Sequence, residues 1–184
     1  MCWHLGKKGL LIIVIIAGAI VWSEVCGMIR EGTPAPHIET TLSSGQPFSL
    51  ADYLDKKHVV LFFYPKDFTP GCTREACSFR DHYAELTNLD AVLIGVSFDT
   101  EQSHSEFIEK YRLPFPLISD IDNSIGTAYG VARFGGLLFR PKRVTFVIDK
   151  GGIVRKVSHH EFSIDKHLDE VLASLKTLRD EGAG

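Results

Sequence analysis

Residues 58–81 read HVVLFFYPKDFTPGCTREACSFRD, an apolar run followed by a helix start. The run from His58 to Tyr64 is rich in β-forming residues and almost entirely apolar. A strand that is buried on both faces has this pattern, which indicates a sheet covered by helices on both sides. Thr69 and Pro70 then supply a preferred N-cap and first residue of a helix. We therefore expect a central strand, a short loop and a helix, in this order.

Strands and helices continue to alternate after this unit. Periodicity predicts strands over residues 91–98, 115–119, 144–149 and 153–158, and helices over residues 101–111 and 123–129 and at the C-terminus. In the C-terminal helix, one stripe consists of Leu168, Val171, Leu172, Leu175 and Leu178. This order, ending in a hairpin and a helix, indicates an α/β fold.

The first thirty residues differ from the rest of the chain. Lys7 and Lys8 precede an apolar run, residues 9–22, that contains no charged group. The pattern lies between a cleaved secretory signal and a short signal-anchor, and the anchor is favoured because no convincing cleavage site follows the run. We expect an apolar helix in the membrane within residues 1–30 and one domain over residues 31–184.

The basic start of this segment also predicts an orientation. Lysines that precede an apolar helix stay on the cytoplasmic side of a membrane. The domain would then lie on the non-cytoplasmic side, periplasmic or extracellular. We therefore expect a membrane-anchored or exported protein, with a cytoplasmic protein as the alternative.

Charge and cysteine content exclude several classes of function. The 184-residue chain has a net charge of −3 and no evident basic stripe, so we expect no nucleic-acid partner. Its four cysteines, Cys2, Cys26, Cys72 and Cys77, are too few for a disulfide framework in a chain of this size. A second close pair of Cys or His ligands, as in zinc sites, is missing from the sequence. We expect neither a metal nor a cofactor.

Cys72 lies in the first turn of the predicted helix, on the stripe that faces the sheet. Backbone N–H groups in this turn have no helical partner, and the helix dipole is positive there. Both effects favour a thiolate, the reactive form of cysteine. Open α/β sheets also bind ligands past the C-terminal ends of their strands, where Cys72 is placed. Inert packing is a weak explanation for this position, so Cys72 is the candidate nucleophile.

Cys77 follows Cys72 by five residues. In an intact helix, five residues give about 7.5 Å of rise and about 140° of rotation, so the two Cα atoms are roughly 8.6 Å apart. A disulfide needs Cα atoms within about 7 Å. The two cysteines can therefore bond only if the first turns of the helix unwind. Packing in the core is an alternative for Cys77, because free cysteines are often buried.

The segment resembles the active-site motif of the peroxiredoxins. Pro65, Thr69 and Cys72 match the signature Pro-x-x-x-Thr-x-x-Cys, and the position of Cys77 is similar to that in the Q-type (bacterioferritin-comigratory) subfamily. The resemblance extends roughly from residue 32 to the C-terminus. It implies a thioredoxin-like fold, with a central mixed sheet flanked by helices. It also implies an arginine that opens a later strand, which Arg143 matches; spacing alone could not have selected it over the other arginines, Arg74, Arg80 and Arg140.

The resemblance implies a thiol peroxidase that reduces hydrogen peroxide and organic hydroperoxides. Cys72 would attack the peroxide, and Cys77 would then form a disulfide with it. Pro65 would shield the thiolate from water, Thr69 would bind thiolate and peroxide, and Arg143 would stabilise their charge. Thioredoxin or a similar dithiol would reduce the disulfide. The expected protein is an antioxidant enzyme and a monomer or weak dimer.

Two other functions fit parts of the sequence. A membrane-tethered thiol–disulfide oxidoreductase acting on proteins normally carries Cys-x-x-Cys, which this chain lacks. A copper-handling module of the same fold would use two nearby cysteines and a distant histidine, such as His159 or His160. The Cys-x₄-Cys spacing argues against it. We expect the other histidines considered, His37, His104 and His167, to lie on the surface.

Overall fold

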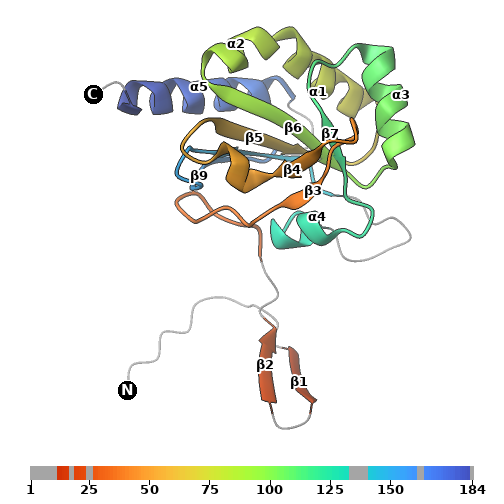
Figure 1. Ribbon diagram of the computed structural model, residues 1–184, viewed down its shortest axis with the longest axis vertical. Coiled ribbons are helices and arrows are strands. Elements are labelled where there is room, and N and C mark those ends of the chain that lie inside the picture. Colours follow the sequence, from red (N-terminus) through yellow and green to blue (C-terminus); the bar gives the residue numbers. More distant parts are fainter. Residues whose placement is uncertain (1–11, 17–18, 24–26, 133–140, 161–163, 183–184) are drawn as a thin grey trace.

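The computed structural model describes residues 12–16, 19–23, 27–132, 141–160 and 164–182 (Figure 1). At its centre is a five-stranded sheet with the strand order β7 (Leu117–Ser119), β6 (Ala91–Ser97), β5 (His58–Phe63), β8 (Val144–Ile148) and β9 (Val154–Ser158). Strands β5, β6 and β7 are parallel, whereas β8 is antiparallel to both β5 and β9. The sheet is therefore mixed, as expected, and the predicted buried strand β5 lies in its middle.

Different elements cover the two faces of this sheet (Figure 1). One face packs against four helices, α1 (Pro70–Asp81), α2 (Tyr83–Asn88), α3 (Glu101–Tyr111) and α5 (Ile164–Gly182). The other packs against a two-stranded sheet, β3 (Glu39–Thr41) and β4 (Pro47–Ser49), the 3₁₀ helix η1 (Leu50–Tyr53) and α4 (Ser124–Ala128). A central mixed sheet between such layers is the arrangement of a thioredoxin-like fold.

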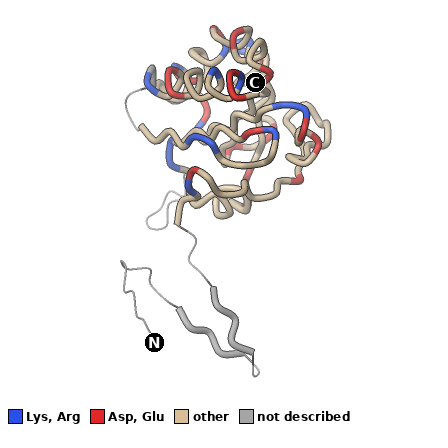
Figure 2. The backbone as a smooth tube through the Cα atoms, turned by 90° about the vertical axis from the view of Figure 1, so that its left-hand side faces the viewer, with Lys and Arg blue, Asp and Glu red and all other residues tan. Residues whose placement is uncertain are grey.

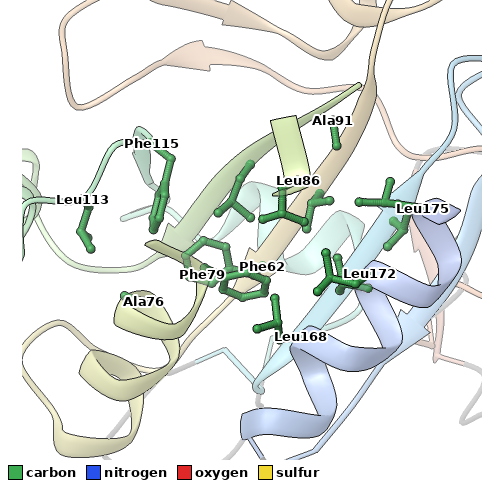
Figure 3. Packing of buried hydrophobic residues seen from close by; sticks show 14 of the residues in the cluster. Phe62, Ala76, Phe79, Leu86, Ala91, Leu113, Phe115, Leu168, Leu172 and Leu175 are labelled. Carbon is green, nitrogen blue, oxygen red and sulfur yellow. The ribbon is translucent and has the colours of Figure 1, made fainter. Parts of the chain in front are cut away.

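Strand β5 contributes to both hydrophobic clusters because successive side chains point to opposite faces. Val60 and Phe62 belong to the cluster beneath the four helices, and Figure 3 shows side chains of α1, α2 and α5 gathered around Phe62. Val59, Leu61 and Phe63 belong to the cluster on the other face. All six residues of β5 are buried, which explains the almost continuous apolar run in the sequence.

The register of the sheet brings the start of α1 close to the start of β8. Strand β5 ends at Phe63, and a short loop leads from it to Pro70, the first residue of α1. Phe63 pairs with Val144, the first residue of the antiparallel strand β8. Arg143 precedes Val144. It therefore lies at the same end of the central strands as the loop before α1.

The apolar N-terminal segment differs from its prediction. Residues 12–16 and 19–23 form two antiparallel strands, β1 (Ile12–Ile16) and β2 (Ala19–Ser23), drawn apart from the domain in Figure 1. We expected an apolar helix here, and the structure does not confirm it. Isoleucine and valine make up all of β1 and two of the five residues of β2, and β-branched residues favour strands over helices. Among the described residues, no helix combines the length and apolar character needed to cross a membrane.

Acidic and basic residues are interspersed over the described domain (Figure 2). Asp90, at the N-terminal end of β6, accepts hydrogen bonds from Lys57 at 2.7 Å and Lys150 at 2.5 Å. These two bonds lower the pKa of Asp90 below its ordinary value. Exposed pairs of this kind contribute little to stability, so the fold depends mainly on the two apolar clusters.

We predict that Leu175→Ala lowers the free energy of unfolding by about 2–5 kcal/mol, because it leaves a cavity between α5 and the sheet. Leu175 is completely buried in the cluster beneath the four helices. Asp169→Ala, on the exposed side of the same helix, should change that energy by less than about 0.5 kcal/mol. Urea denaturation measures both. Equal losses in the two variants would contradict the packing described here.

Candidate active site

Cys72 is the third residue of α1, in the first turn, as the sequence predicts. Thr69 is the N-cap residue, with extended backbone angles of φ −75° and ψ 146°, and Pro70 follows at the first helical position. The Cys72 side chain is only 2% exposed and packs in the cluster with Ala76 and Phe79. Its sulfur therefore lies near the N-terminal end of α1, where the helix dipole is positive. It is also largely shielded from bulk water.

Arg143 is hydrogen-bonded to the sulfur of Cys72. Its Nη2 donates to Cys72 Sγ at 3.3 Å, and its Nη1 donates to Glu75 Oε2. Burial alone would lower the pKa of the Arg143 guanidinium, but Glu75 and Cys72 together raise it above its ordinary value. The guanidinium therefore stays charged beside the sulfur of Cys72.

Glu75 is a site residue that the sequence analysis missed. It lies three residues after Cys72 on α1, so both side chains leave the same side of the helix. Its side chain is 1% exposed, and a buried carboxylate needs a partner, here Arg143. The sequence did carry one signal for Glu75: a charged residue next to Ala76, on the side of the helix that is buried. Gly71 leaves space for the guanidinium of Arg143, because a Cβ at residue 71 would lie 3.2 Å from Nη2.

His167 is buried behind Glu75, and the prediction that it lies on the surface is wrong. The first turns of α5 pack on β8, which brings His167 Nδ1 within 3.2 Å of Thr145 Oγ1 and 3.9 Å of Glu75 Oε1. Its Nε2 lies 2.8 Å from the carbonyl oxygen of His160. Burial lowers the pKa of His167 to about 4, so the ring is neutral near pH 7 and contacts Glu75 without a charge of its own.

The other two histidines that we expected on the surface differ from each other. His37 is exposed, as predicted, and lies 3.0 Å from Glu39. His104 is completely buried, and its Nδ1 lies 2.8 Å from Asp67 Oδ2. The prediction for His104 is wrong because α3 turns this side chain toward the loop before α1. The sequence offers a weak signal here, since His104 lies three residues before the buried Phe107.

Thr69 and Pro65 lie in the chain segment next to Cys72, and both are half-buried. The Thr69 hydroxyl donates to the carbonyl oxygen of Lys66 at 2.9 Å. A hydroxyl has one proton to donate, so Thr69 must rotate before it can donate to a thiolate or a bound peroxide. Pro65 directly follows the buried Tyr64 at the end of β5.

Cys72 and Cys77 are both free thiols on one continuous helix. Cys77 is half-buried, whereas Cys72 is buried. The intact helix keeps the two sulfurs apart, in agreement with the helical geometry above. A disulfide between them therefore requires the first turns of α1 to unwind.

The remaining candidates lie elsewhere. Arg80 donates to the carbonyl oxygen of Tyr111 and to Asp81, and Arg74 is exposed. Arg140 and two of the cysteines, Cys2 and Cys26, lie outside the described residues. His160, a copper candidate, is hydrogen-bonded to Glu170 at 2.8 Å. Over the part of the chain that the structure describes, no cluster of three or more His, Cys, Asp or Glu residues could hold a metal ion.

We predict that His167 makes the folded state sensitive to acid. Its pKa falls from 6.5 to about 4 on folding, so between these pH values the unfolded chain binds a proton that the folded chain does not. The free energy of unfolding should therefore fall by up to roughly 2–3 kcal/mol as the pH falls from about 6.5 to about 4. His167→Asn should remove this part of the pH dependence in urea denaturation. Parallel pH curves for the two proteins would count against the prediction.

Comparison with known proteins identifies the family. Residues 32–157 match the AhpC/TSA family. The curated peroxiredoxin Q of Sedum lineare is 39% identical over 159 residues, which cover 85% of this chain and 83% of that protein. The crystal structure of peroxidoxin BcpB from Mycobacterium tuberculosis is similar with a TM-score of 0.76 and 38% identity, and covers 82% of this chain and 98% of that one.

A third similar protein is the bacterioferritin comigratory protein of Xanthomonas campestris, with a TM-score of 0.71, 32% identity and coverage of 77% of this chain and 92% of that one. The relatives contradict the prediction of a membrane-anchored or exported protein, because those of Sedum lineare and Oryza sativa are named chloroplastic. The family match and these similarities show that the chain belongs to the AhpC/TSA family, as a peroxidase of the peroxiredoxin Q type.

Proposed function

We propose that Cys72 is the peroxidatic cysteine of this enzyme and that its substrates are hydrogen peroxide and organic hydroperoxides. The observation that carries the proposal is the hydrogen bond from Arg143 Nη2 to Cys72 Sγ at the N-terminal end of α1. Organic substrates are supported by the Xanthomonas campestris relative, whose structures address its alkyl peroxide reduction activity. The proposed role of the enzyme is antioxidant defence.

In the first step, the Cys72 thiolate attacks one oxygen of the peroxide. An S–O bond forms and the O–O bond breaks, so Cys72 is oxidised to a sulfenic acid. The departing oxygen takes up a proton and leaves as water or an alcohol. Arg143 stabilises the thiolate before the reaction and the negative charge on the departing oxygen during it. Glu75 holds the guanidinium in the position from which it can do both.

Thr69 and Pro65 shape the surroundings of the sulfur. When the Thr69 hydroxyl turns away from the Lys66 carbonyl, it can donate to the thiolate or the peroxide. Pro65 has no N–H group, and its ring adds an apolar surface beside the reacting atoms. Both side chains would restrict water at the site.

In the second step, the Cys77 thiol attacks the sulfur of oxidised Cys72. An S–S bond forms, the S–O bond breaks, and the hydroxyl group leaves as water with the Cys77 proton. The first turns of α1 must unwind for this step, because the two cysteines are too far apart in an intact helix. Thioredoxin or a similar dithiol would then reduce the disulfide by thiol–disulfide exchange.

The catalytic domain in this proposal extends over residues 31–184. The family match begins at Gly32, whose backbone N–H donates to the carbonyl oxygen of Val154 in β9 at 2.7 Å. Val154 N–H in turn donates to Thr33, and Ala35 N–H to Gly152. These bonds attach residues 32–35 to the edge of the central sheet. Residues just before them also contact the domain, since Ile29 N–H donates to the Tyr129 carbonyl oxygen and Val157 N–H to Glu31 Oε1, which supports a boundary near residue 31.

We expect Cys72→Ser to reduce the rate of peroxide consumption by about a thousandfold or more, because a serine hydroxyl is a much weaker nucleophile than a thiolate. Stopped-flow measurement with hydrogen peroxide and excess thioredoxin gives this rate. Circular dichroism on the same sample checks that the variant is folded. A folded variant with a near-normal rate would refute the assignment of Cys72.

Cys77→Ser should leave the first oxidation of Cys72 within about twofold of normal, since Cys77 does not take part in it. Steady-state turnover with thioredoxin should fall by at least about tenfold, because no intramolecular disulfide forms. Single-turnover and steady-state assays on the same preparation separate the two effects. Unchanged steady-state turnover would rule out the resolving role of Cys77.

A further inference from the structure

A buried polar cluster attaches the loop before α1 to helix α3. It consists of Tyr64, Asp67, Ser103 and His104, which we call the Asp67 clasp. Asp67 Oδ1 accepts a hydrogen bond from the Tyr64 hydroxyl at 2.8 Å. Asp67 Oδ2 accepts one from Ser103 Oγ at 2.8 Å and lies 2.8 Å from His104 Nδ1. The exposed fractions of Tyr64, Asp67 and His104 are 1%, 2% and 0%, so water competes little for these bonds.

The clasp also connects the loop to the central sheet. His104 Nε2 lies 3.1 Å from the carbonyl oxygen of Ile118 in β7. The Asp67 N–H donates to Asp99 Oδ2 at 2.8 Å, and the same oxygen accepts a bond from Ser97 at the end of β6. Burial and the neighbouring Asp67 raise the pKa of Tyr64 well above its ordinary value, which keeps its hydroxyl protonated as a donor. Asp67 is thus held by α3, β6 and its own loop.

Phe68, the next residue, is held in a strained conformation. Its φ of 61° is in the left-handed region, which disfavours residues with a Cβ. Its ring packs edge-on against Phe107 of α3, with centroids 5.1 Å apart, and Lys110 Nζ lies 5.4 Å from the ring centroid. Contacts with α3 therefore hold a backbone conformation that would relax if the loop were released.

The loop and the first turn of α1 are connected stiffly. Thr69 is hydrogen-bonded to Lys66, and the ring of Pro70 restricts its φ. Cys72 follows Asp67 by only five residues, so a large displacement of Cys72 would also move Asp67 away from its hydrogen-bond partners. At its other end, α1 is held on α3 by the bond from Arg80 Nη1 to the Tyr111 carbonyl oxygen at 2.9 Å. Unwinding of the first turns therefore strains the hydrogen bonds of the clasp.

We propose that the Asp67 clasp keeps α1 wound and so limits the rate at which Cys77 reaches the sulfur of oxidised Cys72. The inference rests on the proposed resolving role of Cys77. Clasp residues act through the loop and are positioning residues. Loosening the clasp raises the population of the unwound helix, which speeds disulfide formation. The first oxidation uses the wound helix and keeps its rate as long as that form predominates.

Two tyrosines of the chain allow a matched test. Tyr64→Phe removes one hydroxyl from the clasp, and Tyr129→Phe removes one from an equally buried ring in the cluster on the other face of the sheet. Each hydroxyl donates one hydrogen bond, from Tyr64 to Asp67 at 2.8 Å and from Tyr129 to the Pro36 carbonyl at 3.0 Å. Ser103→Ala is a second change within the clasp, because it removes the hydroxyl that donates to Asp67 Oδ2 at 2.8 Å.

The measurement is a single turnover of the full chain with one equivalent of hydrogen peroxide. Acid quenching, thiol alkylation and mass spectrometry follow the sulfenic acid of Cys72 and the Cys72–Cys77 disulfide over time. Tyr64→Phe and Ser103→Ala should form the disulfide about fivefold to tenfold faster than the wild-type chain, because each loses a hydrogen bond to a carboxylate. Their rate of Cys72 oxidation should stay within about twofold of normal. Tyr129→Phe should match the wild-type chain in both steps.

Disulfide formation at equal or lower rates in both clasp variants would overturn the proposal while leaving the resolving role of Cys77 intact. Equal acceleration in Tyr129→Phe would also overturn it, because general destabilisation would then explain the effect. Absence of a Cys72–Cys77 disulfide in the wild-type chain would overturn the resolving role and, with it, this inference.

Discussion

The hydrogen bond between Arg143 and Cys72 imposes the main constraint on this structure. A guanidinium that is 5% exposed loses most of its hydration, so it needs anionic partners within the fold. The carboxylate of Glu75 accepts a hydrogen bond from Nη1, and the sulfur of Cys72 accepts one from Nη2. Gly71 leaves space beside this guanidinium, since a Cβ at residue 71 would lie 3.2 Å from Nη2. The charge that serves the chemistry thus also determines which residues surround it.

Helix α1 lies between two buried polar networks. On one side, Glu75 leads to Arg143 and the neutral ring of His167 on α5. On the other side, the loop before the helix is attached to α3 through Asp67 and His104. In the proposed mechanism, attack on the peroxide uses the wound helix, in which Arg143 donates a hydrogen bond to Cys72. In the same proposal, disulfide formation requires these turns to unwind, so the strength of the attachments would control the balance between the two steps.

Several errors of prediction have a common physical origin. His104 and His167 lie in helices with many polar residues, so their sequence context suggested the surface. Each is buried because a partner from a distant part of the chain, Asp67 or Thr145, satisfies the ring. The residues around each histidine in the sequence do not indicate these distant partners, Asp67 and Thr145.

The sequence by itself determined the features that depend on neighbouring residues. The apolar run of β5, the Thr69-Pro70 helix start and the position of Cys72 in the first turn all follow from local backbone preferences. Only the tertiary structure decided that Arg143 meets Cys72 and that Glu75 holds it. Arg143 is 71 residues away in the chain, and the antiparallel register of β8 against β5 brings it to the sulfur. Such a contact arises from strand pairing and burial, which act between segments far apart in the sequence.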